Sequence, residues 1–377
     1  MISKLNLVVW IIFILTFVPN MVLVVEGVTS LPLYANLTSY LLAVPLFVPL
    51  FYKCSFFKIS QKLLLIYLYS ALFLLSNYYT ISDVASKQKS LSVIYSIVIP
   101  CILLAFSFML IKEREYCIRK YVSIGIRYSS FIIVLLTLLY LTGFKENAAD
   151  EGRTFVKGMI DPIWSSRYIG FLLLFQLYNL IKRLKKINIM DILSFPCALF
   201  LFVQSGSRGP LVAIGLTVLY VLCPKLSLKK NIILFACLLF SCFLFMSYSS
   251  RMQSDASDYS NQARIMLISK IFDSDFDYWK GVGIGSYNLL ISGIDELYYP
   301  HNIFVETFVE TGILGLLVLL MLVYAMFVKK YIDIMFIICL FYFLNAQLSG
   351  DISGNNMFFI FLELYFWQNM PFKYITR

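Results

Sequence analysis

The sequence predicts an all-α, polytopic integral membrane protein with about 12 transmembrane helices. Of its 377 residues, 60% are hydrophobic and only 14% are charged, whereas soluble domains carry about 25% charged residues. Apolar stretches recur whose length approaches the roughly 20 residues that cross a bilayer. The basic residues gather in alternate connections between these stretches, as membrane orientation requires.

The apolar stretches place the helices along the chain. We expect them at about 5–25, 31–51, 62–80, 91–111, 121–143, 163–181, 189–205, 210–223, 231–249, 302–328, 331–349 and 357–371. The chain is then a single membrane domain over residues 1–377, with a long external loop before helix 10.

The distribution of charge orients these helices. With both termini in the cytoplasm, most of the 31 Lys and Arg residues fall in cytoplasmic connections, and most of the 21 acidic residues fall outside. The net charge of +10 therefore reflects membrane orientation rather than nucleic-acid binding. The eight cysteines include no C-x-x-C pair, which argues against a metal site or a disulfide framework.

Two external segments are longer than connections need to be, at about 144–162 and 250–301. Long loops of this kind often carry function. Within the second, residues about 262–280 alternate apolar and charged side chains at helical spacing. We expect an amphipathic helix there that lies on the outer membrane surface.

Arginines on the external face indicate an anionic ligand, because the guanidinium fork suits phosphate. Arg208 is the strongest candidate, in the turn Ser207-Arg208-Gly209 between two short apolar helices. The glycine allows close backbone approach, and the turn and the following helix start can bind an anion. The alternative is a tight turn whose arginine reaches for water. Arg153 and Arg264 are the other candidates that we retain.

His301 is the only histidine, and it lies beside Asn302 where a late membrane helix begins. Histidine ordinarily titrates near neutral pH, so His301 is the candidate acid or base; the alternative is a structural role. Glu306 and Glu310 share one face of the following helix. Acids within membrane helices face the interior. Either could orient His301, and we favour Glu310.

Other polar and glycine-rich features carry weaker signals. Gly281, Gly283 and Gly285 could form a phosphate loop or a flexible turn, and Gly312 and Gly315 are typical of helix packing. Glu363 is predicted to make a buried hydrogen bond. The acidic run Asp273, Asp275 and Asp277 could attract a cation, but a solvated face fits it better, so we expect no metal and no cofactor.

In their order and topology, four local patterns resemble the O-antigen polymerase and O-antigen ligase family of bacterial membrane glycosyltransferases. They are Ser207-Arg208-Gly209; Arg264 followed by the glycines at 281, 283 and 285; His301-Asn302 with Glu310-Thr311-Gly312-Ile313-Leu314-Gly315; and Arg153 with Asp161-Pro162. The family often has asparagine at the position of Asp161, so the last pattern departs from it.

The resemblance implies an enzyme of the bacterial cytoplasmic (inner) membrane whose active site faces the periplasm or exterior. Its donor and acceptor would be polyprenyl-diphosphate-linked oligosaccharides, with membrane lipids and a chain-length regulator as partners and no nucleic acid. Arg153, Arg208 and Arg264 would bind diphosphate, and His301 with Glu310 would activate the acceptor hydroxyl. Ser207, Gly209, Gly281, Gly283, Gly285 and Asn302 would support them.

These expectations lead to a polymerase of O-antigen or capsular repeat units that transfers glycan without a metal. The nearest alternative is an O-antigen ligase, which transfers finished polysaccharide to lipid A-core. A lipid-linked oligosaccharide flippase is the alternative from another class. Transporters usually carry polar or broken helices at the membrane midplane, and this sequence gathers its distinctive residues on one face. A scaffold for a polysaccharide assembly complex would not need these residues to converge.

Overall fold

The computed structural model gives the protein a helical fold. It describes residues 4–21, 43, 46, 61–111, 113–147, 154–156, 162–182, 186, 188–222, 266, 269–271, 273–328 and 333–369. The predicted helix at 231–249 lies outside the described residues, and of the predicted helix at 31–51 only residues 43 and 46 are described, both helical. In the predicted surface helix at 262–280, Met266, residues 269–271 and Asp273 are helical, whereas residues 274–280 are not, so the helix does not extend to 280 as expected.

The first half of the chain contributes five α-helices and two short helical turns of other kinds. They are α1 (Lys4–Met21), α3 (Gln61–Leu75), the 3-10 helix η2 (Ser76–Tyr78), α4 (Val84–Val93), the π-helix η3 (Ile94–Val98), α5 (Ile99–Met109) and α6 (Arg114–Leu141). The helices α4, η3 and α5 run on into one another. This continuous segment begins at Val84, seven residues before the predicted start at 91, so Lys87 and Lys89 belong to the helix and not to the loop.

Among the described residues of the second half there are seven helices, after a short hairpin that the sequence did not predict. The hairpin pairs β1 (Lys145–Asn147) with β2 (Thr154–Val156), antiparallel, with Glu146 opposite Phe155. The helices are α7 (Pro162–Lys182), α8 (Ile189–Ser205), α9 (Arg208–Leu222), α12 (Tyr287–Ser292), α13 (Ile303–Phe327), α14 (Ile334–Ala346) and α15 (Asn356–Gln368).

Three helical segments among the described residues are long and apolar enough to cross a membrane. They are Val84–Met109, Arg114–Leu141 and Ile303–Phe327, and shorter apolar helices accompany them. Half of the most apolar window in each is buried inside the protein, so the other apolar half must face an apolar medium. This pattern supports a polytopic membrane protein.

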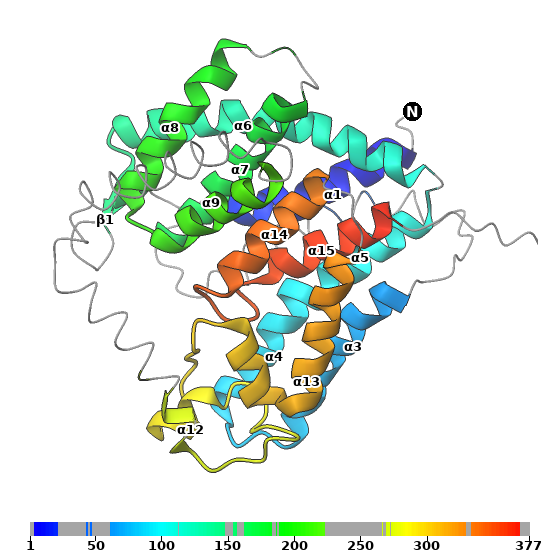
Figure 1. Ribbon diagram of the computed structural model, residues 1–377, viewed down its shortest axis with the longest axis vertical. Helices are drawn as coiled ribbons and strands as arrows, with labels where there is room; N and C mark the ends of the chain where they lie inside the picture. Colours follow the sequence, from blue (N-terminus) through cyan, green and yellow to red (C-terminus); the bar gives the residue numbers. More distant parts are fainter. Residues whose placement is uncertain are drawn as a thin grey trace, which may run out of the picture.

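Helix α15 runs through the middle of the bundle (Figure 1). Every residue from Asn356 to Trp367 is buried, against α14, α5, α3 and α6. The buried charge on this helix, Glu363, accepts hydrogen bonds at Oε1 from the Tyr67 hydroxyl (3.2 Å) and from Nε1 of Trp367 (3.1 Å). The predicted buried hydrogen bond of Glu363 is therefore confirmed.

Helix α13 is broken at Gly312, where the backbone leaves the helical region (φ 66°, ψ −166°). In an unbroken helix the N–H of Ile313 would bond to the carbonyl of Val309. Here the N–H of Ile313 donates to Tyr278 O (2.9 Å), and Val309 O accepts from Val282 N (2.9 Å). The role of Gly312 is thus to permit this break, which corrects the expectation that it serves helix packing.

The segment Gly281–Gly285, the glycine loop, fills the break in α13. Gly283 N donates to Glu310 O (3.0 Å), and the hydroxyl of Thr80 donates to Ile284 O (2.9 Å). A Cβ on Gly281 would lie 2.5 Å from Val309 O, and one on Gly283 would overlap the backbone of Thr80. The glycines therefore allow close backbone packing, and the loop is held on both sides instead of forming a flexible turn.

We predict that Gly283→Ala destabilises the protein far more than Gly143→Ala. The two glycines have nearly the same backbone angle (φ 90° and 91°), but nothing lies within 4 Å of a Cβ on Gly143. Gly143→Ala should cost only the left-handed backbone strain, about 1 kcal/mol. Gly283→Ala adds the overlap with Thr80 and should cost roughly 3 kcal/mol or more. Thermal unfolding of the detergent-solubilised variants measures the difference, and equal midpoints would contradict the docking of this loop.

Candidate functional site

His301 and Asn302 form the N-terminal boundary of α13. The Asn302 side chain caps the helix, because Oδ1 accepts from the N–H groups of Phe304 (3.0 Å) and Val305 (3.2 Å). Its Nδ2 donates to Gln347 O (3.4 Å). Asn302 therefore fixes where α13 begins and ties that point to the connection between α14 and α15.

The His301 backbone is strained. Its φ of 59° is the one positive value at a non-glycine residue among the described part of the chain, and such outliers cluster at functional sites. Its imidazole packs edge-on against Tyr299, with ring centroids 4.8 Å apart, and against Tyr298 at 6.3 Å. The residue is half-buried, and Nδ1 of its ring is buried.

Arg208 is the first residue of α9, directly after a tight turn from α8. Gly206 closes α8 in the left-handed conformation (φ 58°), and the hydroxyl of Ser207 donates to Ser205 O (3.4 Å). Arg208 is half-buried and lines a cleft with Ile163, Ser207, Gly209, Pro210, Leu348 and Ser349. A cation at the start of a helix, with backbone N–H groups beside it, suits an anionic ligand.

The two motifs meet at the connection Gln347–Asn355 between α14 and α15. On one side Asn302 donates to Gln347 O. On the other side, a Cβ on Gly209 would lie 3.4 Å from Cβ of Leu348, the residue that follows Gln347. The structure therefore brings Ser207-Arg208-Gly209 and His301-Asn302, about 90 residues apart in sequence, to neighbouring points of one short connection.

Arg167, on α7, donates hydrogen bonds to backbone carbonyls of this connection. Its Nη2 donates to Ser349 O (2.6 Å), its Nη1 donates to Gly354 O (3.3 Å), and its guanidinium lies 5.5 Å from the ring centre of Trp164. The Asp351 carboxylate closes the turn by accepting from Gly354 N (2.7 Å) and from the Ser353 hydroxyl (2.6 Å). Arg167 thus holds backbone carbonyls that shape the site.

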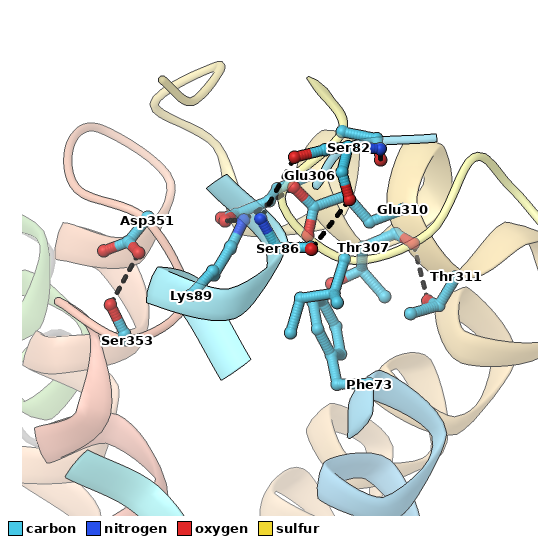
Figure 2. Close-up of polar contacts among 12 residues, drawn as sticks. Phe73, Ser82, Ser86, Lys89, Glu306, Thr307, Glu310, Thr311, Asp351 and Ser353 are labelled. Atoms are coloured by element: carbon cyan, nitrogen blue, oxygen red, sulfur yellow. Dashed lines mark hydrogen bonds and ion pairs between the residues drawn. The ribbon is translucent and has the colours of Figure 1, made fainter. Parts of the chain in front are cut away.

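Glu310 is fully buried, and its Oε1 accepts from Nζ of Lys89 at 2.6 Å; Lys89 also pairs with Glu306, one turn earlier on α13 (Figure 2). Both glutamates face the protein interior, as their place in a membrane helix predicts. The structure therefore pairs Glu310 with Lys89 on α4, and the expected support of His301 by Glu310 stays a prediction.

Lys89 is the site residue that the sequence did not reveal. On the sequence alone Lys89 falls in the loop between the predicted helices at 62–80 and 91–111, because the residues before the apolar run at 91 are polar. Its partners lie 217 and 221 residues further along the chain, so no local pattern marks the pair. The spacing of the two glutamates four residues apart was the available signal that one cation could bridge them.

The remaining candidates fall into three groups. Arg153 and Arg264 lie outside the described residues. Gly281, Gly283 and Gly285 pack against Gly312, Thr80 and Ala85, so they allow the glycine loop to dock, and a phosphate-binding role for them stays a prediction. Asp273, Asp275 and Asp277 are exposed, as a solvated face requires.

A distant carboxylate caps α4 and so anchors the segment between α12 and α13 to it. Asp295 accepts from the Ser82 hydroxyl (2.5 Å) and from the N–H groups of Asp83 (3.0 Å), Val84 (3.1 Å) and Ala85 (3.3 Å). The Ser82 hydroxyl and these N–H groups lower the pKa of Asp295 from 3.8 to about 2. Hydrogen bonds to the ionised form favour it over the protonated form.

Comparison with known proteins gives one positive finding. Residues 193–320, about a third of the chain, match the family model described as O-antigen ligase. Over this region the chain is similar to the O-antigen ligase family. Comparisons with curated proteins and with solved structures found no match.

The O-antigen ligase match covers only part of what the structure brings together. Arg208, the glycine loop, His301 and Glu310 all lie within it, whereas Lys89, Arg153 and the connection at 347–355 lie outside. Ligases and polymerases of this family act in membranes on lipid-linked glycans. The predicted resemblance is therefore confirmed for residues 193–320.

We predict that Asp295→Asn lowers the stability of the protein in a pH-dependent way. Because the folded pKa lies below the ordinary value, the carboxylate contributes its full stabilisation above about pH 4 and loses it as the pH falls through about 2. The gap in unfolding midpoint between wild type and variant should be widest near neutral pH and close in acid. Asp273→Asn, which alters an exposed carboxylate, is the control and should show no such gap. A gap that widens in acid would contradict the cap.

Proposed function

We propose that this protein is a polymerase of lipid-linked oligosaccharide repeat units of O-antigen or capsular polysaccharide. The observation that carries the proposal is the convergence of Arg208 and His301 on the connection at 347–349, within a chain that matches the O-antigen ligase family. An arginine that binds an anion beside a histidine that accepts a proton suits transfer from a diphosphate donor.

In the proposed reaction, an acceptor sugar hydroxyl attacks the anomeric carbon of the donor glycan. The new glycosidic C–O bond forms, the bond from that carbon to the diphosphate oxygen breaks, and polyprenyl diphosphate leaves. His301 takes the proton of the attacking hydroxyl. Arg208 offsets the charge that grows on the departing diphosphate, and Arg153 and Arg264 are proposed to join it. The reaction then needs no metal ion, because cationic side chains neutralise the leaving group.

The same proposal includes the membrane arrangement. The chain would cross the bacterial cytoplasmic membrane about 12 times as a single domain over residues 1–377, with both termini in the cytoplasm. The loops at about 144–162 and 250–301 would face the exterior, and residues about 262–280 would lie on the outer membrane surface. The half-exposed apolar helices support a multi-pass arrangement, and the distribution of basic residues supports the orientation. A chain-length regulator is the proposed protein partner.

An O-antigen ligase is the second candidate, because the matched family carries that description. Both reactions use the same leaving group and base, and they differ in the acceptor. A polymerase elongates another lipid-linked unit, whereas a ligase moves a finished chain to lipid A-core. The products separate them: loss of a polymerase leaves single repeats, and loss of a ligase leaves long chains on the polyprenyl lipid.

We predict that Arg208→Ala and His301→Ala each abolish the polysaccharide ladder. A strain lacking the gene is complemented with wild type or variant, membrane levels are matched, and surface polysaccharide is separated on a gel. Loss of a general base should slow transfer by roughly 100- to 10,000-fold, which leaves single repeats on the acceptor. Arg119→Ala, at an exposed position, is the control and should give the full ladder. Full polysaccharide ladders from both site variants would contradict the mechanism. Long polysaccharide chains that stay on the polyprenyl lipid would favour the ligase.

A further inference from the structure

The buried cluster of Lys89, Glu306 and Glu310 has no part in the reaction above. All three side chains are fully buried, in a part of the structure that is otherwise apolar or uncharged except for Asp351. Lys89 Nζ bonds to Oε1 of each glutamate. Figure 2 shows the lysine reaching from α4 toward the two carboxylates on the first turns of α13.

The charges of this cluster do not balance. Two carboxylates share one ammonium group; among the described residues Oε2 of Glu306 has no hydrogen-bond partner, and the Glu310 carboxyl receives one further hydrogen bond, from the backbone of Gly285. Asp351 does not compensate them, because it is acidic too and is satisfied by Ser353 and Gly354. An unpaired buried charge is costly. The cluster becomes neutral if the two glutamates hold one proton between them, as close carboxylate pairs do.

Stability alone does not account for such a cluster. Apolar residues of similar volume usually replace a buried ion pair without loss of stability, and the best-supported benefit of burying charge is a defined geometry. The start of α13 does not have a fixed orientation by itself. The break at Gly312 separates residues 303–311, which follow His301, from the rest of the helix, so contacts from other elements must fix their direction.

Lys89 supplies such a contact on the face where the glycine loop docks. Glu310 is held twice, by Lys89 at its side chain and by Gly283 N at its carbonyl (3.0 Å). Glu306 lies four residues after Asn302, the cap that adjoins His301. The lysine therefore ties the segment behind His301 to α4, whose own start is capped by Asp295.

We propose that Lys89 is a positioning residue for glycan transfer: by bridging Glu306 and Glu310, which share one proton, it fixes the segment of α13 that aims His301 at the acceptor. This inference rests on the proposed function, since it assigns Lys89 a role in that reaction. Lys89 acts through His301 and touches no substrate. Its loss should therefore slow the transfer step and leave donor binding by the arginines unchanged.

The test uses the full-length protein in membrane vesicles from the strain lacking the gene. The probe is the pool of lipid-linked repeat units extracted from that strain. The central variant is the triple Lys89→Met, Glu306→Gln, Glu310→Gln, which removes all three charges and leaves none unpaired. Lys87→Met, an exposed lysine on the same helix, is the matched control. Membrane amount, kcat and the KM for the repeat unit are measured for each.

We expect the triple variant to reach the membrane in wild-type amount with kcat lowered on the order of 100-fold, the effect of a small misplacement of a reacting group, at unchanged KM. Lys87→Met should match wild type. A triple variant with wild-type kcat would overturn the proposal. So would one that is absent from the membrane, because the cluster would then serve the fold itself. If wild-type vesicles fail to elongate the repeat units, the proposed function fails instead, which keeps the two failures distinguishable.

A second comparison tests the shared proton. Glu306→Gln mimics the protonated glutamate and leaves Lys89 paired with Glu310, so kcat should stay within about threefold of wild type, the scale of a lost neutral hydrogen bond. The double variant Glu306→Gln, Glu310→Gln leaves the ammonium group of Lys89 buried without a carboxylate, so it should lose activity. The single variant Lys89→Met should lose activity as well. If Glu306→Gln is as inactive as the double variant, the two glutamates do not share one proton.

Discussion

The break in α13 is the constraint on which the packing of the glycine loop and the start of α13 depends. A helix in a membrane normally satisfies its own backbone groups, because lipid offers no hydrogen-bond partner. At Gly312 the hydrogen bonds within the helix are interrupted. Val282, Gly283 and Tyr278 provide the missing hydrogen-bond partners. The glycine loop must therefore be docked for α13 to exist in this form. Because the loop also contacts Thr80, the break couples the α3–α4 connection to the late helices.

The connection at 347–355 is where this coupling reaches the candidate chemistry. It is short, and its shape is determined by Arg167 from α7, by the capped carboxylate of Asp351 and by Asn302. Arg208 and His301 approach it from two different parts of the chain. The relative position of Arg208 and His301, the proposed anion-binding and proton-accepting groups, is thus set by buried contacts behind the site. A change in α4 or α7 can alter the reaction without touching a substrate, as pre-organised sites generally allow.

Hydropathy predicted the helices well because lipid imposes a length and a polarity on each. It misplaced the start of α4, where Lys87 and Lys89 resemble a loop until the distant partners of Lys89 are known. It also gave no sign of the break at Gly312, since a glycine in an apolar helix is equally typical of close helix packing. The candidate residues were chosen by their chemistry: Arg208 by its turn and His301 by its place at a helix start. Their meeting at Gln347 and Leu348 could not be predicted, because it depends on contacts between elements far apart in sequence.

The separation of Lys89 from its partners has a consequence for how the chain is made. Glu306 is synthesised 217 residues after Lys89, which is roughly 10 to 40 s at a rate of 5–20 residues per second. During that interval neither Glu306 nor Glu310 exists, so the ammonium group lacks both partners that it has in the folded protein. Its position near the start of α4, five residues after Val84, lets the side chain reach toward water meanwhile. The burial of Lys89 against the two glutamates can therefore be completed only after the last third of the chain has been synthesised.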